Sequence, residues 1–333
     1  MSCPDAALVL AAGLGTRFRP LSAIRAKAAV PLAGESLIRR IVRWLARYGV
    51  RNVVVNLHHR PETIAAEAGD GSDLGVVVRY SWEQPILGSA GGPRRALPLL
   101  DGDTVLIVNG DHLTDLDLDA LAGTHAASGA AVTLALSPDW DARRYGGVAL
   151  DAAGAVSGFG RNLPGPVFHF FGVQLAHRSV FDGVPDGVAS ESFTGVYPVL
   201  MADRPGCVRG YVSNARFWDV GTPGDYLAAA LAVARHEHQV APPPGQRASI
   251  HPSSRLVDTV VWDDVTIEGD CELVRCIVAD RVRIPTGSRF QDAAIVEADA
   301  VAAAPGDRLE GGLLVTSLST SSATSHASRP SAH

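Results

Sequence analysis

The chain of 333 residues lacks any run of 18 or more uncharged apolar residues, so no membrane-spanning helix can be read from it. Its first ten residues contain Asp5 and no basic cluster, unlike a secretory signal peptide. It also lacks a basic surplus, since the formal net charge is −6. Nucleic-acid binders usually carry such a surplus. These absences predict a cytoplasmic protein that binds neither a membrane nor nucleic acid.

Cysteine is scarce, with four residues in the chain. Only Cys271 and Cys276 lie close together, and no second pair or histidine spacing completes a zinc site around them. Reduced thiols are therefore predicted. The sequence also shows no Ser/His/Asp or Cys/His arrangement of the kind used in nucleophilic catalysis. A zinc site and a side-chain nucleophile of this kind are both disfavoured.

Apolar residues make up 47 % of the chain and charged residues 19 %, which is enough to build a sizeable core. Composition divides the chain into four zones. We expect a catalytic domain over 1–235, a proline-rich linker over 236–248, a short repeat domain over 249–313 and a disordered tail over 314–333. The linker contains three consecutive prolines, and the tail is rich in Ser, Thr and Ala.

Short apolar runs alternate with amphipathic stretches in the first zone. The runs predict strands over 7–11, 53–55, 76–80 and 105–108, and the stretches between them predict helices over 37–45, 61–68 and 93–99. Uninterrupted apolar strands are typical of sheets covered on both faces. We therefore predict an α/β fold with a Rossmann-like, mixed but mostly parallel sheet between helices. Ligands of such folds bind beyond the carboxyl ends of the strands.

Aliphatic residues recur every six positions in the third zone. Val261, Ile267 and Leu273 are six apart, and a second series with the same spacing begins five residues later at Val278. This rhythm favours a short left-handed parallel β-helix built from hexapeptide repeats, with ordinary β structure as the alternative. An exposed end coil would need a partner, so a homo-oligomer through this segment is expected.

A glycine-rich loop follows the first predicted strand. Gly13 and Gly15 allow a ligand to approach the backbone closely, and Arg17 offers a planar group suited to phosphate oxygens. The spacing matches neither the dinucleotide fingerprint nor the Walker loop. Lys27 follows ten residues after Arg17 and strengthens the interpretation as a phosphate site.

Several segments, taken in order, resemble the sugar-1-phosphate nucleotidyltransferases, also called NDP-sugar pyrophosphorylases. They are the loop LAAGLGTRFRPLS, the segment KAAVPLAG, and the later motifs LGSAGG at 87–92, VNGD at 108–111, YG at 145–146 and FWDVGTP at 217–223. The resemblance covers about residues 7–230 and is closest to the mannose-1-phosphate guanylyltransferase and N-acetylmuramate-1-phosphate uridylyltransferase subgroups. It implies an enzyme that joins an NTP and a sugar 1-phosphate into an NDP-sugar and pyrophosphate.

The resemblance also implies roles for individual residues. Arg17 and Lys27 would be catalytic, Asn109, Gly146 and Arg161 would hold the sugar phosphate, and the nucleotide would contact Leu10, Ala11, Ala12, Gly13, Gly15, Thr16, Arg17, Gln84, Pro85, Gly88 and Ser89. An amide side chain reads purine and pyrimidine edges alike, so Gln84 does not name the base.

Two acidic residues at strand ends, Asp111 and Asp219, match the family's metal ligands and are expected to bind Mg²⁺. The cation suits a reaction between two polyanions, since in-line attack on the α-phosphate needs charge neutralisation and alignment. Asp219 is not needed as a helix cap, because Thr222, Pro223 and Asp225 already form one.

The sequence departs from the family at two places. Lys27 is flanked by alanines where the family has prolines, and Arg161 stands where many members have a Glu-Lys pair. The alternative is therefore a regulatory subunit that binds an NDP-sugar with weak or no catalysis. Residues 168–172 would enter the sugar side of the pocket or simply form a buried strand.

Overall fold

The computed structural model describes residues 3–138 and 146–318. The chain forms two compact units, Met1–Gly221 and Thr222–His333, and each is described by itself. The division lies ahead of the expected boundary after residue 235, because helix α6 (Pro223–His236) packs within the second unit. There the indole Nε1 of Trp262 donates to the buried hydroxyl of Tyr226 at 2.8 Å. None of the helices in the described ranges is long and apolar enough to cross a membrane.

Among its described residues, the first unit contains five α-helices: α1 (Leu37–Arg47), α2 (Pro61–Ala68), α3 (Gly88–Ala96), α4 (Leu118–Ser128) and α5 (Tyr197–Asp203). Its strands are β1 (Ala6–Leu10), β2 (Pro31–Leu32), β3 (Glu35–Ser36), β4 (Asn52–Leu57), β5 (Val77–Trp82), β6 (Thr104–Asn109), β7 (His112–Thr114), β8 (Val132–Ser137), β9 (Gly147–Leu150), β10 (Val156–Gly160), β11 (Val167–His177), β12 (Val208–Val212) and β13 (Phe217–Asp219). Short 3-10 turns include η1 (Thr16–Phe18) and η3 (Lys27–Ala29).

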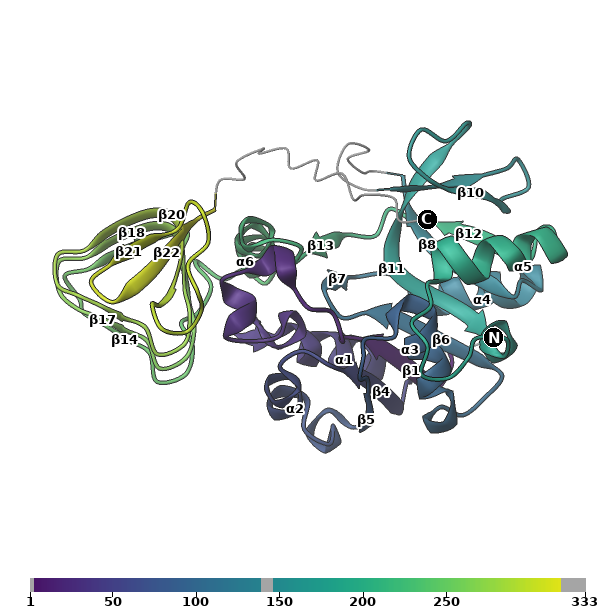
Figure 1. Cartoon of the computed structure of the whole chain (residues 1–333), viewed down its shortest axis with the longest axis horizontal. Helices are drawn as coiled ribbons and strands as arrows, with labels where there is room; N and C mark the ends of the chain where they lie inside the picture. The colour runs from purple at the N-terminus through teal and green to yellow at the C-terminus, as the bar shows by residue number, and fades with distance from the viewer. Residues whose placement is uncertain (1–2, 139–145, 319–333) are drawn as a thin grey trace, which may run out of the picture. The chain divides into compact units, whose positions relative to one another are not determined.

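The central sheet of the first unit has nine strands in a mixed arrangement (Figure 1). Its main order is β10-β9-β11-β6-β1-β4-β5, and β8 pairs with β11 and β12. The half formed by β6, β1, β4 and β5 is parallel and consists of the four strands that the sequence predicts. Beyond β6 the pairing is largely antiparallel, because β11 runs against β6, β8 and β9. The sheet is therefore mixed. The predicted parallel pairing is found among β6, β1, β4 and β5, but not between β11 and its neighbours.

Helix α3 begins at Gly88 rather than at the expected Pro93. Proline has no N–H, so Pro93 cannot donate to the carbonyl of Ser89 four residues earlier. That carbonyl instead accepts from the hydroxyl of Ser192 at 2.7 Å. A side chain from another part of the unit thus replaces the missing helical bond, and the helix extends through the proline.

Successive residues of the strands point to opposite faces of the sheet, and helices cover both. One face carries Leu8, Val54 and Leu134, which form a buried cluster with Ala90 of α3 and Tyr197 of α5. The opposite face receives α4, where the ring Nδ1 of His125 lies 2.8 Å from the Thr133 hydroxyl. The carboxyl ends of β1, β4 and β6 share one edge, so their following loops lie together.

The second unit consists of α6 and short strands. The strands are β14 (Ser249–Ile250), β15 (Arg255–Val257), β16 (Val260–Val261), β17 (Thr266–Ile267), β18 (Glu272–Val278), β19 (Arg283–Ile284), β20 (Arg289–Glu297), β21 (Arg308–Glu310) and β22 (Leu313–Ser317). The expected cap of α6 is confirmed, because Thr222 and Asp225 form a reciprocal capping box and Pro223 occupies the first turn.

Strands of the second unit stack in parallel with a constant offset. Ile250 aligns with Ile267 and then Ile284, and Val261 aligns with Val278 and then Ile295. Residues that bond across neighbouring strands of this stack, such as Arg275 and Asp292, are 17 apart. A repeat of 17 residues is two steps of six and one of five, which accounts for the five-residue step in the sequence. The aligned apolar residues form the buried core of this unit.

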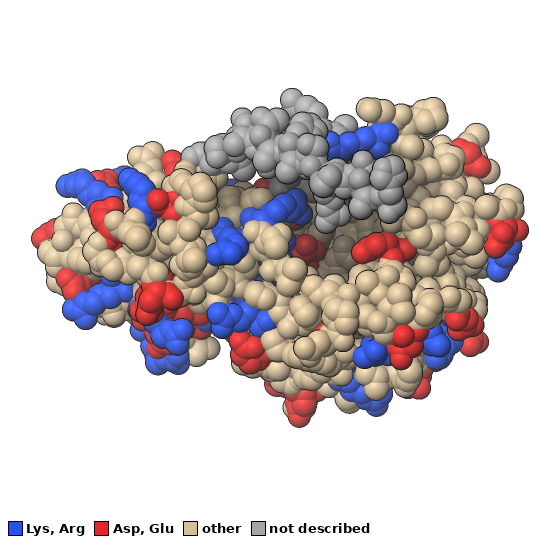
Figure 2. Space-filling view, viewed as in Figure 1, with Lys and Arg blue, Asp and Glu red and all other residues tan. Residues whose placement is uncertain are grey.

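Exposed charged residues of the second unit form ion pairs between neighbouring strands of the stack. The carboxylate of Glu272 accepts from Arg255 at 2.8 Å and from Arg289 at 2.6 Å, and Arg275 pairs with Asp292 at 2.6 Å. Figure 2 shows basic and acidic side chains interspersed on the visible face. Along the row formed by Arg255, Glu272 and Arg289, the charge of the side chains alternates in sign.

The beginning of the expected tail is ordered. Residues 313–317 form β22, which pairs antiparallel with β20 and with β21. Leu313, Leu314 and Val315 are buried there, so the prediction of disorder from residue 314 is wrong for this strand. The apolar LLV segment supplies the buried surface that stabilises this strand. Residues 319–333 lie outside the described part of the chain.

Candidate active site

A cavity of about 250 Å³ lies at the carboxyl edge of β1, β4 and β6. Ten of the residues predicted from the sequence line it: Leu10, Ala11, Ala12, Gly13, Gly15, Lys27, Gly88, Ser89, Asn109 and Asp111. They come from segments far apart in the chain, which the parallel half of the sheet brings to one edge. Ala28, Asn56, Glu83, Ile86 and Gly110 complete the lining.

The glycine loop is tight at two points. Gly15 has a φ of +61°, a conformation that costs glycine little, and a Cβ there would lie 3.1 Å from the Cβ of Ser22. The amide of Gly110 donates to the Leu10 carbonyl at 2.8 Å, and a Cβ on Gly110 would lie 2.9 Å from that same oxygen. The loops after β1 and β6 therefore meet without an intervening side chain, which leaves the space above them for a ligand.

Two buried polar side chains support the cavity from below. The Asn56 carbonyl oxygen accepts from the backbone amides of Ala11 at 2.5 Å and Ala12 at 3.1 Å. Its amide group donates to Glu83 at 2.7 Å, and the second carboxylate oxygen of Glu83 accepts from the Leu87 amide at 2.8 Å. The amides of Ala11 and Ala12 thus face Asn56 rather than the cavity.

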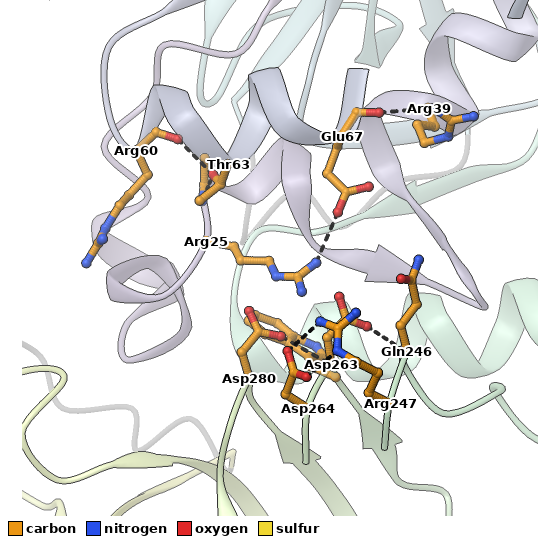
Figure 3. A network of polar contacts seen from close by, with 12 residues as sticks. Arg25, Arg39, Arg60, Thr63, Glu67, Gln246, Arg247, Asp263, Asp264 and Asp280 are labelled. Carbon is orange, nitrogen blue, oxygen red and sulfur yellow. Dashed lines mark hydrogen bonds and ion pairs between the residues drawn. The ribbon is translucent and has the colours of Figure 1, made fainter. Parts of the chain in front are cut away.

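Lys27 is held by its neighbours although its flanking prolines are absent. The guanidinium of Arg25 forms an ion pair with Glu67 of α2 at 3.2 Å, and the Ala26 amide donates to the Thr63 hydroxyl at 3.1 Å (Figure 3). Ala26 and Ala28 are buried. Helix α2 therefore fixes the segment, and alanines fill the space on either side of the lysine.

Asp111 lies between the ammonium of Lys27 and the ring of His112. Its carboxylate is 3.6 Å from the Lys27 ammonium and 2.5 Å from the ring Nδ1 of His112. Burial alone would raise the pKa of Asp111, but the charges and hydrogen bonds of His112 and Lys27 outweigh it and hold that pKa well below its usual value. For His112, burial lowers the pKa, and the nearby Asp111 carboxylate raises it above its usual value on balance. Asp111 is therefore an anion at neutral pH.

Asp219 reaches the same edge from a distant part of the sequence. Strand β13 pairs antiparallel with β7, with Asp219 opposite His112. The amide of Val220 donates to the Asp111 carbonyl at 3.1 Å. The two acidic residues that the sequence predicts as metal ligands are thus placed on adjoining backbone segments.

A second cavity of about 420 Å³ shares Asn109 with the first. Its other walls are aromatic or small: Phe159, Phe170, Phe193, His112, His169, Thr194, Gly146, Gly147, Val148 and Gly160. Burial, with His112 nearby, lowers the pKa of His169 to about 4, so this ring is neutral at pH 7. Residues 168–172 lie in β11, so they form a strand, and His169 and Phe170 also face this cavity.

Six predicted site residues line neither cavity. Thr16, Arg17, Gln84, Pro85 and Arg161 are all exposed, and Asp219 is half-buried. Thr16, Gln84, Pro85 and Arg161 each adjoin a lining residue in the sequence, as Arg161 adjoins Gly160. Tyr145, which belongs to the family motif, lies outside the described residues.

The sequence reasoning missed Asn56 and Glu83 as parts of this site. The available signal was a polar residue at the end of each of two apolar strands that share an edge. It also overlooked that Lys27 is the one lysine of the sequence, because 28 of the 29 Lys and Arg residues are arginine. An amine that occurs once in the chain and lies in a cavity is a strong candidate for function.

The comparisons with known proteins agree with this geometry. The family model described as nucleotidyl transferase matches residues 6–160. The structure of HddC from Yersinia pseudotuberculosis superposes with a TM-score of 0.59 at 21 % identity, over 68 % of this chain and 99 % of that one, which shows a shared fold. Both comparisons indicate a nucleotidyltransferase-like α/β fold.

Curated relatives narrow the class. The chain is 30 % identical over 300 residues to the mannose-1-phosphate guanylyltransferase of Mycobacterium tuberculosis, covering 81 % of this chain and 83 % of the relative. It is 34 % identical over 226 residues to the N-acetylmuramate alpha-1-phosphate uridylyltransferase of Neisseria meningitidis, covering 65 % of this chain and 93 % of that protein. The chain belongs to the sugar-1-phosphate nucleotidyltransferase family.

Proposed function

We propose that this protein joins an NTP and a sugar 1-phosphate into an NDP-sugar with release of pyrophosphate. A phosphate oxygen of the sugar attacks the α-phosphorus, the new P–O bond forms, and the bond from the α-phosphorus to the pyrophosphate oxygen breaks. The cavity at the carboxyl edge of β1, β4 and β6 is called the loop cavity from here on. The observation that carries the proposal is the contact of 3.6 Å between the Lys27 ammonium and the Asp111 carboxylate in its wall. It supplies both signs of charge that two phosphate reactants and a cation require.

Lys27 is assigned to the reacting phosphates. Its ammonium is held in place by the anchored segment around it, so little ordering is needed when the substrates arrive. A preorganised cation in a partly closed site stabilises the charge that develops during phosphoryl transfer. Arg17, exposed in the loop after β1, is assigned to the outer phosphates of the NTP.

Asp111 and Asp219 are assigned to Mg²⁺. The donor set fits, because Asp111 is anionic at neutral pH and Asp219 lies on the backbone paired beside it. Within the described ranges no cluster of three or more His, Cys, Asp or Glu residues could hold a metal ion by itself. Two carboxylates completed by substrate phosphates are the arrangement Mg²⁺ usually takes, and the ion would neutralise and orient those phosphates.

The second cavity is assigned to the sugar, with Asn109, Gly146 and the neighbouring Arg161 on its phosphate. Among the described residues that line it there is no lysine or arginine. The phenylalanines of this cavity could stack on the face of a sugar ring. We favour mannose 1-phosphate with GTP because the relative that is 30 % identical is a mannose-1-phosphate guanylyltransferase, and N-acetylmuramate 1-phosphate with UTP is the second candidate.

The regulatory alternative loses its main support. It rested on looseness around Lys27, but Arg25, Thr63 and buried alanines hold that segment. The ion pair of Lys27 with Asp111, and the pairing that sets Asp219 opposite His112, support the catalytic proposal.

We further propose a division of labour between two domains. Residues 1–235 would carry catalysis, and the coils from residue 249 onward would form a short left-handed β-helix of hexapeptide type, supported by the parallel stacking described above. An oligomer through this segment and a cytoplasmic location stay predictions. Sedimentation of the purified chain would test the first of them.

The proposed reaction is tested by measuring pyrophosphate release with a panel of NTPs and sugar 1-phosphates in the presence of Mg²⁺. We expect the highest kcat/KM with GTP and mannose 1-phosphate. A higher value with UTP and N-acetylmuramate 1-phosphate would transfer the assignment to the second pair. Binding of an NDP-sugar without pyrophosphate release from any pair would overturn the catalytic proposal.

A further inference from the structure

The buried pair Asn56 and Glu83 joins two walls of the loop cavity. Asn56 holds the Ala11–Ala12 backbone on one side, and Glu83 holds the Leu87 amide on the other. The pair is connected by its own hydrogen bond of 2.7 Å. Asn56 is 3 % exposed and Glu83 0 %, so neither can exchange these partners for water.

The packing around this pair is equally specific. A Cβ on Gly92 of α3 would lie 2.7 Å from a carboxylate oxygen of Glu83 and 3.0 Å from the amide nitrogen of Asn56. Helix α3 can therefore approach the pair only because residue 92 has no side chain. The amino-terminal residues of that helix, Gly88 and Ser89, line the cavity.

We infer that Asn56 and Glu83 are positioning residues that set the width of the nucleotide site. Neither acts on the reacting atoms. Their hydrogen bonds fix the distance between the loop after β1 and the amino terminus of α3, and a nucleotide must fit between these two walls. This inference rests on the proposed assignment of the cavity to the nucleotide.

The direction of each hydrogen bond makes the pair sensitive to single changes. Asn56→Asp would set a carboxylate against the Glu83 carboxylate. Glu83→Gln would point an amide group either at the Asn56 amide or at the Leu87 N–H, so one bond is lost in either orientation. A buried donor or acceptor left without a partner is costly.

The double variant Asn56→Asp/Glu83→Gln restores every bond with the polarity of the central one reversed. The new carboxylate at position 56 would still accept from Ala11 and Ala12. The new amide at position 83 would donate to that carboxylate and accept from Leu87. The single buried negative charge is kept and moves from one position to the other. Rescue by the double variant is therefore expected only if the hydrogen bonds themselves matter.

The experiment measures KM for the nucleotide, KM for the sugar 1-phosphate, kcat and melting temperature in the full-length protein. Each single variant should raise the nucleotide KM by about tenfold, with a smaller effect on the other constants. The double variant should return the nucleotide KM to within about threefold of the wild type. Gly92→Ala, which displaces Glu83, should also raise it. Where turnover is too slow, the Kd of the NTP measured by calorimetry replaces KM.

The matched control is Thr133→Val, which removes the buried contact of 2.8 Å to His125 away from both cavities. It should lower the melting temperature without changing the nucleotide KM. The inference is overturned if the single variants behave like this control, or if the double variant is as impaired as the two single effects combined. The single variants Asn56→Asp and Glu83→Gln could fail to fold. In that case a folded double variant with a near wild-type nucleotide KM supports the inference. Failure of the double variant to fold overturns it.

Lys27→Met separates this inference from the proposed function. If it leaves turnover unchanged, the cavity is not the active site and the proposed function fails. If it abolishes turnover while the Asn56 and Glu83 variants leave the nucleotide KM unchanged, the function stands and the positioning role is wrong.

Discussion

The two units of this protein differ in one use of charged residues. Both carry exposed ion pairs, such as Arg255 with Glu272 in the second unit and Arg216 with Asp115 in the first. In the first unit, charged groups also gather at a cavity, where Lys27 and Asp111 form part of the wall and His112 contacts Asp111. Exposed pairs contribute little to stability, whereas gathered and partly buried charges are retained where chemistry needs them.

The largest effect is expected from removing the cation of the first unit. Lys27→Met should lower kcat by about 10² to 10³, since a preorganised charge at the reacting centre is lost. Lys27→Arg keeps the charge and should retain more of the rate. Steady-state kinetics of both variants provide the measurement. Equal losses in the two would show that charge is not what Lys27 contributes.

The rarity of lysine offers an independent check of that assignment. Lys27 is the only lysine in the chain, so an amine-reactive reagent can modify only this side chain and the terminal amine. Saturating NTP should protect Lys27 from modification, as followed by peptide mass spectrometry. Unchanged labelling with bound nucleotide would show that Lys27 does not face the phosphates.

Interior packing of the second unit should matter next. Tyr226→Phe removes the acceptor of the buried Trp262 indole N–H and should lower the free energy of unfolding by about 1 to 3 kcal/mol. Pyrophosphate release should not change. Denaturant titration provides the measurement, with Val240→Ala, which is fully exposed, as the control. Equal stability of the two variants would contradict the buried role of this contact.

A pH effect is expected from His125 of the first unit. Burial, with His177 nearby, lowers the pKa of His125 from 6.5 to about 4. The unfolded chain then binds more protons than the folded one between these values, so stability is present above pH 6.5 and is lost as pH falls toward 4. Melting temperatures across this window should fall less steeply in His125→Gln. An equal slope in the variant would show that another group is responsible.

The smallest effect is expected from the exposed pairs of the second unit. Arg275→Ala breaks the ion pair with Asp292 and should cost about 0.2 to 1 kcal/mol, with a further decrease of that cost at high salt. Denaturant titration at two salt concentrations measures it. A loss above about 2 kcal/mol would remove the contrast between the two units.

The sequence predicted the parallel half of the sheet because its strands are continuous apolar runs. It could not predict that β8 to β11 are antiparallel, because the alternation of strands and helices does not extend to that region. Helix α3 was placed too late because the partner for the Ser89 carbonyl, Ser192, lies 103 residues away. The tail was placed too early because the pairing of β22 with β20 is a tertiary contact.

The candidate site shows the same limits. Motifs located the cavity-lining residues, because family motifs lie at strand ends and strand ends share an edge. They could not show that Arg17 and Gln84 are exposed and line neither cavity, since exposure depends on the loops around them. Nor could they show that Arg25 and Thr63 replace the missing prolines beside Lys27, because helix α2 reaches that segment only in the folded chain.

The central claim is that Asp111 and Asp219 act together on one Mg²⁺ ion. The most direct test is a Mg²⁺ titration of pyrophosphate release in Asp111→Asn, Asp219→Asn and the control Asp115→Asn, whose carboxylate pairs with Arg216 at 2.7 Å outside both cavities. We predict that the first two variants lose about 10²-fold or more of the rate and that any residual rate needs more Mg²⁺, while the control matches the wild type. Wild-type rates and Mg²⁺ dependence in Asp111→Asn or Asp219→Asn would contradict the claim.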